Sequence, residues 1–309
     1  MWLINKARLD EALFTRRYVV DILEGRCEPL TVLLSRAAPH IPESEWSERI
    51  QVGGVHVNGA PVSGNCIIEP PARVEYFEPR DGGLISSQYP LWSREWIVYE
   101  DNDLIVINKP TRLPTLPVRE QNLHNLRRYL EEYLSHPVHL PSRLDTSTSG
   151  LVIASKSSDT HRGLQRSFET RAVLKRYLCE LSGVPSFTTL TLSSPIGRHP
   201  LHPVLRCTHS AGKSALTCFT VVELRDNSAL VEARPITGRT HQIRVHAMAL
   251  GYPLVGDNFY NGAESPNLHL CCVELGLNHP RTGAALRIAL PEKARPSWIR
   301  AEEGSKRPS

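Results

Sequence analysis

A short polar stretch that precedes a short apolar run is the feature that most constrains this chain. Residues 143–150 hold an arginine, Asp145 and four consecutive hydroxyl side chains, and residues 151–154 read Leu-Val-Ile-Ala. Because the apolar run is short, uncharged and partly β-branched, it is typical of a buried strand. Such a strand would hold the preceding turn rigidly, as a reacting carboxylate requires. The alternative is that Asp145 and its hydroxyl neighbours only satisfy their own backbone in an ordinary turn.

Two further stretches accompany this one. Residues 97–110 read as a strand, an acidic turn and a second strand that stops at a proline, and residues 234–246 are dense in polar groups before the chain runs on to 250–257. In this order and spacing, the three stretches resemble the pseudouridine synthases of the RluA family. The resemblance covers about residues 94–295, which is most of the chain.

The resemblance implies an α+β fold in which a mixed, mostly antiparallel sheet is flanked by helices. It also implies an isomerase that converts specific uridines of structured RNA (rRNA or tRNA) to pseudouridine. That reaction breaks the N-glycosidic bond, turns the uracil and rejoins it through carbon 5, so it requires no cofactor and no metal. The implied partner is structured RNA, and the implied enzyme is a monomer.

The resemblance assigns the catalytic carboxylate to Asp145, its arginine partner to Arg244 and the aromatic ring beneath the target base to Tyr177. A nearby arginine keeps a carboxylate ionised, and stacking on an aromatic ring is worth about 1–3 kcal/mol per base. Read alone, Tyr177 would more often be a core residue, and a buried Asp–Arg pair is often only structural. The resemblance also implies four residues that bind the substrate: Arg143, Thr148, Arg239 and His241.

The sequence before the catalytic domain is typical of a small α+β domain, predicted over residues 27–80. Residues 50–59 alternate and end in Asn58-Gly59, a strong hairpin signal, and proline near residue 42 predicts the start of a second helix. These features resemble the small RNA-binding module of a small-subunit ribosomal protein, for which Arg36 and Arg49 are the main basic candidates. The alternative is a small domain that merely packs.

The remaining segments complete the predicted organisation. Residues 1–26 form an extension with helical character near 10–18, residues 81–93 a polar linker and residues 296–309 a polar tail. Within the catalytic domain at 94–295, leucine spacing predicts amphipathic helices at 122–134 and 159–170, and the segment 187–213 reads as a loop. Lys109 is predicted to be structural support near the cleft.

Composition narrows the class further. The formal charge of +4 is modest, so any basic surface for RNA must come from local arrangement. The apolar runs are of strand length, so we expect no membrane span. The seven cysteines contain no Cys-x-x-Cys pair, which favours reduced thiols in the cytoplasm, or in an organelle if the source is eukaryotic.

Other chemistries fit less well. Asp145-Thr146-Ser147 is similar to the Asp-Thr-Gly motif of aspartic proteases, but the glycine is missing and no second copy supplies a dyad. His241 and His246 lack the glutamate and spacing of a zinc helix, so no metal is predicted. Two alternatives remain: a non-catalytic RNA-binding protein with the same fold, and a hydrolase that uses Asp145 without a visible second acid.

Overall fold

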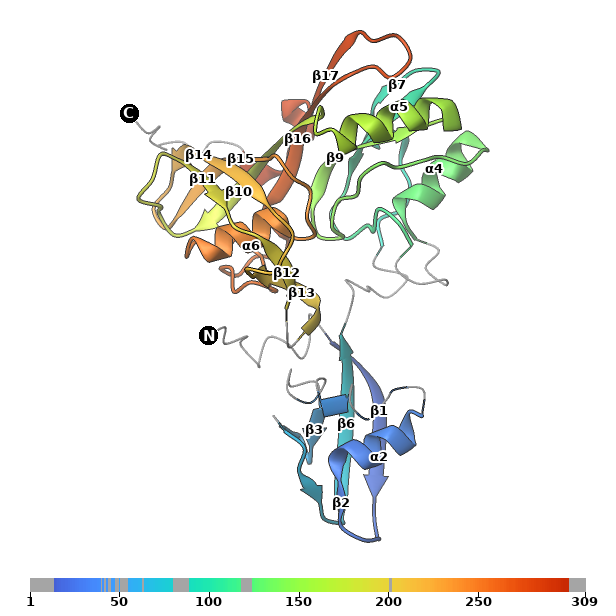
Figure 1. The fold of residues 1–309 in the computed structure, drawn as a ribbon, viewed down its shortest axis with the longest axis vertical. Helices are drawn as coiled ribbons and strands as arrows, with labels where there is room; N and C mark the ends of the chain where they lie inside the picture. Colours follow the sequence, from blue (N-terminus) through green and yellow to red (C-terminus); the bar gives the residue numbers. More distant parts are fainter. Residues whose placement is uncertain are drawn as a thin grey trace. The chain divides into compact units, whose positions relative to one another are not determined.

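The computed structural model describes residues 14–39, 41, 43, 46, 47, 50, 55–62, 64–79, 89–117, 124–199 and 202–299. The chain divides into two compact units (Figure 1). One contains Met1–Asp81 and Arg198–Cys207, and the other contains Gly82–Gly197 and Thr208–Ser309. Most of the predicted linker at 81–93 and of the tail at 296–309 lies outside the described residues.

The amino-terminal unit contains a four-stranded antiparallel sheet and helical segments among its described residues. The sheet order is β1-β6-β3-β4, and the strands are β1 (Phe14–Ile22), β6 (Ala72–Pro79), β3 (Val55–Val57) and β4 (Ala60–Pro61). Helix α2 (Leu30–Ala37) follows the short strand β2 (Glu28–Pro29), which pairs with β5 (Ile67–Ile68). The core includes Trp46, whose ring meets Tyr76 edge-on at 4.7 Å between centroids. The predicted hairpin is confirmed, because β3 and β4 pair across Asn58-Gly59.

The helical prediction near residues 10–18 is wrong where the structure describes it. Residues 14–22 form β1, which pairs with β6 in the register Val20↔Val74. Along the strand, Val19 is exposed and Val20 is half-buried, so the β-branched residues follow the period of two of a strand, and pairing with β6 overrides local helix propensity. Residues 42 and 49 lie outside the described part. Arg36, one of the two basic candidates for RNA binding, forms an ion pair with Glu28. The RNA-binding role of this unit stays a prediction.

The second unit is built on a nine-stranded sheet among the residues described. The order is β11-β14-β15-β10-β16-β9-β8-β7, with β17 paired to β16. Among the described strand pairs of this sheet, only β9 and β16 run parallel, so the predicted mixed, mostly antiparallel sheet is confirmed. The strands are β7 (Ile97–Glu100), β8 (Leu104–Lys109), β9 (Ser149–Ser155), β10 (Leu174–Ser182), β11 (Thr189–Ser193), β14 (Leu216–Leu224), β15 (Ser228–Pro235), β16 (Leu270–Asn278) and β17 (Ala285–Ala289).

Three helices pack on this sheet in the described part of the unit. Helices α4 (Leu126–Leu134) and α5 (Ser158–Glu169) bury Leu130 and Leu164 in the core formed with β8, β9 and β16. Helix α6 (Gln242–Ala249) buries Ile243 in a second core with β10, β14 and β15. The two predicted amphipathic helices are therefore present, although residues 122 and 123 lie outside the described residues.

The loop predicted at 187–213 instead contains three strands. Residues Thr189–Ser193 alternate between threonine and leucine and pair with β14 as β11. Strands β12 (Ile196–His199) and β13 (His202–Thr208) then pair with each other. The loop was predicted from the histidines and prolines of this segment. The alternation of threonine and leucine, which is typical of a half-buried edge strand, was overlooked.

Gly150 joins the polar turn to the sheet. Its φ is +104°, and a Cβ at this position would lie 2.2 Å from the backbone oxygen of Cys272 on the adjacent strand β16. A glycine is therefore required for β9 to pair with β16 directly after the turn.

We expect Gly150→Ala to lower the free energy of unfolding by about 2–4 kcal/mol, because the added methyl clashes with backbone and the φ is unfavourable for alanine. Urea denaturation of wild type and variant measures the change. Gly238→Ala is the matched control, since its Cβ would meet nothing within 4 Å. Equal losses in the two variants would contradict this role for Gly150.

Candidate active site

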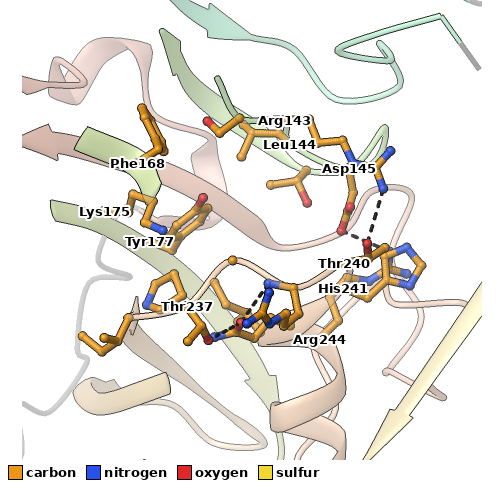
Figure 2. A pocket seen from close by; sticks show the side chains of 18 of the residues that line it. Arg143, Leu144, Asp145, Phe168, Lys175, Tyr177, Thr237, Thr240, His241 and Arg244 are labelled. Atoms are coloured by element: carbon orange, nitrogen blue, oxygen red, sulfur yellow. Dashed lines mark hydrogen bonds and ion pairs between the residues drawn. The ribbon is translucent and has the colours of Figure 1, made fainter. Parts of the chain in front are cut away.

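A pocket of about 600 Å³ lies where the predicted motifs meet. Its walls come from the turn before β9, from β10, from the end of α5 and from the segment that links β15 to α6. Asp145, Tyr177 and Arg244 line it from three different elements (Figure 2). The four predicted substrate-binding residues also line it: Arg143, Thr148, Arg239 and His241.

The turn that carries Asp145 is fixed by hydrogen bonds on both sides. The Thr148 amide donates to the Asp145 carbonyl oxygen at 3.0 Å, which closes the turn. On the other side, the Thr115 hydroxyl donates to the Leu144 carbonyl at 2.7 Å and accepts from the Leu144 amide at 3.1 Å. The carboxylate is therefore presented by backbone that the core holds in place.

Lys109, at the end of β8, is fully buried beneath this turn. Its Nζ donates to the carbonyl oxygens of Leu113 at 2.8 Å, Pro110 at 3.0 Å and Thr146 at 3.3 Å. Burial lowers the pKa of Lys109 to about 7, while the nearby Asp145 carboxylate opposes that shift. This geometry agrees with the predicted supporting role of Lys109, and it adds a cation close to Asp145.

The Asp145 carboxylate lies among several cationic side chains. Burial alone would raise its pKa, but the charges of His241 and Arg244, followed by those of Arg143 and Lys109, outweigh burial, so the pKa lies below the ordinary aspartate value. The carboxylate thus stays ionised while only 21% of the side chain is exposed. An ionised, partly desolvated carboxylate is suited to act as a nucleophile or a base.

Arg244 contacts Asp145 less closely than it contacts a second carboxylate. Its Nη1 lies 3.8 Å from Asp145 Oδ2, whereas its Nε and Nη2 donate to Asp257 at 2.8 and 2.7 Å. Burial lowers the pKa of Arg244, but the two carboxylates, Asp257 first, raise it above the ordinary arginine value. The predicted pair is present as a long contact, and the bidentate partner is a residue to which the sequence assigned no role.

Tyr177 lies on β10, lines the same pocket as Asp145 and is half-buried. Burial raises the pKa of Tyr177 well above its ordinary value, and the Cys272 thiol and the Asp145 carboxylate raise it further. The phenol therefore stays neutral near pH 7. In Figure 2, Phe168 and Lys175 lie at the same end of the pocket as Tyr177, and Thr240 and His241 lie at the other end.

The predicted substrate-binding residues differ in how strongly they are held. His241 is buried, has a left-handed backbone (φ 56°), and its Nδ1 lies 2.8 Å from the Tyr260 hydroxyl. Thr148 is also buried, and its hydroxyl has no hydrogen-bond partner among the described residues. Arg143 is exposed and donates to the Thr240 hydroxyl at 3.4 Å.

The segment with Arg239 and His241 is shaped by Gln242, at the start of α6. The Gln242 Oε1 accepts from the Arg239 amide at 2.9 Å and from the Thr237 hydroxyl at 2.7 Å. Its Nε2 donates to the Leu216 carbonyl and to the Thr217 hydroxyl, both at 3.0 Å. The Arg239 side chain donates from Nε to the Ser214 carbonyl at 3.0 Å.

Sequence reasoning missed Asp257 and Tyr260, which hold Arg244 and His241. The signal available was Gly256-Asp257 at the end of the third motif, but a single acidic residue after a glycine does not identify its partner. Only the fold brings residue 257 against residue 244.

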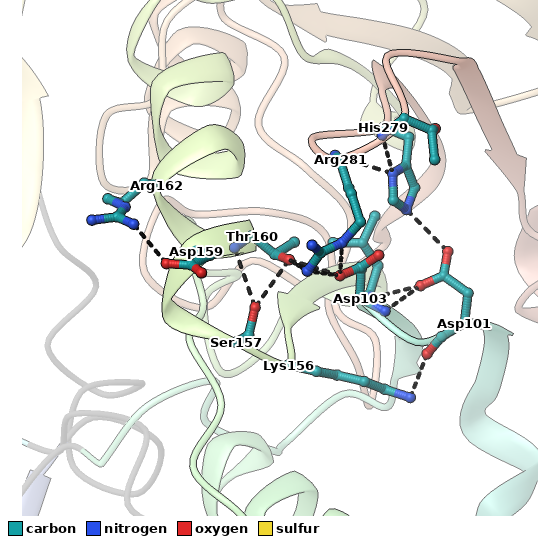
Figure 3. Close-up of polar contacts among 11 residues, drawn as sticks. Asp101, Asp103, Lys156, Ser157, Asp159, Thr160, Arg162, His279 and Arg281 are labelled. Atoms are coloured by element: carbon teal, nitrogen blue, oxygen red, sulfur yellow. Dashed lines mark hydrogen bonds and ion pairs between the residues drawn. The ribbon is translucent and has the colours of Figure 1, made fainter.

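A second polar cluster lies at the far end of β8 from Lys109 (Figure 3). Asp101, Asp103 and His279 place their ligand atoms within 4.8 Å of one another, as in a metal site. Their donors and acceptors are already used internally: Asp103 accepts from Arg281 at 2.6 Å and Thr160 at 2.9 Å, and Asp101 accepts from two backbone amides. With Arg281 supplying the positive charge, this cluster is explained as structural bracing between β8 and the β16–β17 turn.

The comparisons with known proteins agree with this architecture. The family model for RNA pseudouridylate synthase matches residues 103–249. The dual-specificity RNA pseudouridine synthase RluA of Escherichia coli K12 is 36% identical over 204 residues, which are 63% of this chain and 92% of that protein. An RNA pseudouridine synthase of Bacillus subtilis, YlyB, is 32% identical over 269 residues, 81% of this chain and 87% of that protein. The structure of human RNA pseudouridylate synthase domain containing 1 superposes with a TM-score of 0.55 at 29% identity, covering 65% of this chain and 84% of that one.

The sheet and the pocket therefore define a pseudouridine synthase, an isomerase that converts uridine in RNA to pseudouridine. The chain belongs to the RluA family of these enzymes. Among the described residues, none of the helices combines the length and the apolar character needed to cross a bilayer.

Proposed function

We propose that the pocket around Asp145 isomerises specific uridines in structured RNA, either rRNA or tRNA, with the Asp145 carboxylate as the reacting group. The observation that carries this proposal is a carboxylate kept ionised by surrounding cations inside a pocket that also contains an aromatic ring. RNA is the partner of the family, and the choice of a folded RNA rests on the chemistry of the pocket rim.

The pocket is lined by unpaired cationic side chains, which attract a polyanion such as RNA. Four cations line the pocket without any carboxylate within ion-pair distance among the described residues: Arg143, Arg171, Lys175 and Arg239. Elsewhere in this unit most arginines are paired, such as Arg176 with Glu232 and Arg287 with Glu274. Unpaired cations around an ionised carboxylate attract phosphates on either side of a target nucleotide. They also fit a folded RNA, whose backbone brings several phosphates together.

The reacting groups divide the chemistry between them. The ionised Asp145 attacks the sugar or the base as the glycosidic bond breaks, and Arg244 keeps it charged. Arg143, exposed at the rim, occupies the space from which the target nucleotide is extruded, a step that costs a few kcal/mol.

Tyr177 supplies a ring on which the freed uracil stacks while it turns. Because its pKa is raised, its hydroxyl remains a hydrogen-bond donor and is a poor base for the proton on carbon 5.

The proposal also covers the oligomeric state and the cellular compartment of the protein. The proposed enzyme is a monomer. The seven cysteines are free thiols, which suits a reducing compartment such as the cytoplasm.

The test is to incubate the purified protein with total RNA from cells that lack it and to map pseudouridine at nucleotide resolution. We expect new pseudouridines at a few discrete positions in folded rRNA or tRNA, and their loss when the RNA is denatured before the reaction. New pseudouridines confined to unstructured RNA, or none at all, would contradict the proposed substrate class.

A further inference from the structure

We propose that the loop at residues 254–262 positions Arg244 and His241, two neighbours of Asp145. In this proposal Asp257 is the positioning residue for Arg244, and Tyr260 is the positioning residue for His241. The inference rests on the proposed role of Asp145 and adds two residues that act on catalysis only through others.

Asp257 determines which edge of the Arg244 guanidinium faces the pocket. The Asp257 side chain is fully buried, and its two oxygens accept from Nε at 2.8 Å and from Nη2 at 2.7 Å. This bidentate geometry fixes the plane of the guanidinium and leaves Nη1 as the nitrogen nearest Asp145, at 3.8 Å. Arg244 thus supplies charge to Asp145 without a close hydrogen bond that would occupy the reacting oxygen.

Two aromatic residues of the loop also lie against the same guanidinium. The Arg244 Cζ lies 4.8 Å from the centre of the Phe259 ring and 5.1 Å from that of Tyr260. The Phe259 amide also donates to Asp257 Oδ1 at 3.1 Å, so the loop backbone orients the carboxylate. Cation–π contacts of a desolvated arginine add to the ion pair and restrict its rotation.

Tyr260 orients the His241 ring, as Asp257 orients the Arg244 guanidinium. Tyr260 is 1% exposed, and its hydroxyl lies 2.8 Å from His241 Nδ1. His241 has a left-handed backbone directly before α6, a conformation that a non-glycine residue keeps only where its surroundings hold it. The bond to Tyr260 therefore fixes the orientation of a ring that lines the same pocket as Asp145.

The loop itself is closely packed. Gly256 has a φ of +75°, and a Cβ there would lie 1.9 Å from the Asn267 backbone oxygen. The Gly256 amide donates to the Ala263 carbonyl at 2.8 Å, and the Gly262 amide donates to the Asp257 carbonyl at 2.9 Å. Because the loop backbone is fixed, Asp257 and Tyr260 are fixed too, and so are the side chains that they contact.

The experiment is a double-mutant cycle on the single-turnover rate of pseudouridine formation at saturating RNA. We expect Asp257→Asn to lower the rate at least about tenfold in the otherwise wild-type protein. In an Arg244→Met background the same change should have no further effect on the rate, because the residue through which Asp257 acts is already gone. Asp103→Asn, which removes a buried carboxylate from its arginine in the Figure 3 cluster, is the matched control and should leave the rate unchanged.

A second variant keeps the proposal testable if Asp257→Asn fails to fold. Tyr260→Phe removes only the hydroxyl, and we expect the rate to fall about fivefold with RNA affinity unchanged, as for one lost hydrogen bond. Its matched control is Tyr129→Phe, since the buried Tyr129 hydroxyl also lies 2.8 Å from a histidine Nδ1, that of His124, away from the pocket.

Two results would overturn the inference. One is a folded Asp257→Asn or Tyr260→Phe protein whose rate is within twofold of wild type. The other is an Asp257→Asn effect of equal size in the wild-type and Arg244→Met backgrounds, which would show that Asp257 acts independently of Arg244. Either result leaves the proposed function standing, because that function is tested separately, by the mapping of pseudouridine and by Asp145→Asn.

Discussion

Asp145→Asn should form no measurable pseudouridine in a single turnover, with a rate at least about 10⁴-fold below wild type. The amide has nearly the same shape as the carboxylate, so the turn closed by the Thr148 amide is preserved. What is lost is the negative charge that four cations hold in place. RNA affinity should stay within a few-fold of wild type, because the cations that line the rim are untouched.

The control for this prediction is Asp159→Asn on α5, which removes an exposed carboxylate paired only with Arg162. It should leave both rate and affinity unchanged, since exposed pairs contribute little. A rate for Asp145→Asn within tenfold of the control would mean that another group performs the reaction.

Arg244→Met should shift the pH dependence of the rate and destabilise the fold at the same time. In the wild type the pKa of Asp145 lies below the ordinary aspartate value, partly because of Arg244. Without that charge the pKa rises, so the acidic limb of the pH–rate profile moves to higher pH. The lowered pKa of Asp145 also affects stability. Because this pKa is lower in the folded than in the unfolded state, ionised Asp145 stabilises the fold above the unfolded-state pKa, and this contribution is lost as the pH falls through the folded-state pKa.

The loss of stability has a separate cause. Asp257 is fully buried and would lose its bidentate partner, which costs about 3–5 kcal/mol. Arg244→Lys should lie between wild type and the Met variant, because lysine keeps the charge but loses the planar fork. Single-turnover rates against pH and urea denaturation of the three proteins measure both effects. An acidic limb that does not move in the Met variant would show that Arg244 does not control Asp145.

The strands that carry the pocket could be predicted from the sequence because each is a short apolar run beside a clear turn. Strands β8 and β9 read directly from their Ile- and Val-rich runs, and Gly150 marked the turn before β9. These are local signals, and in each case local propensity and the final sheet agree.

The errors arose where long-range pairing decides the structure. Residues 14–22 form a strand because β6, more than fifty residues later, pairs with them. Strand β11 forms because its alternating threonines and leucines meet β14. Neither partner is visible in a local window, and local propensity is a weak guide where tertiary pairing supplies most of the stability.

The site shows the same division. The motif predicted Asp145 and the pair with Arg244, and the structure brings both to one pocket. The role of Asp257 was not predictable, because an aspartate after a glycine has many ordinary uses. In the structure one guanidinium contacts both Asp257 and Asp145 through different nitrogens, and we therefore expect Arg244 both to brace the fold and to tune Asp145.

The most direct test of the central claim is the position of the target nucleotide in a crystal structure of Asp145→Asn bound to a stem-loop that the wild type modifies. The amide variant stops the reaction while leaving the pocket intact, so the substrate should be captured before the bond breaks. We predict an extruded uridine with its uracil on the Tyr177 ring and its glycosidic carbon beside the side chain of residue 145. A target uridine that lies outside this pocket, or whose glycosidic carbon faces away from residue 145, would contradict the account.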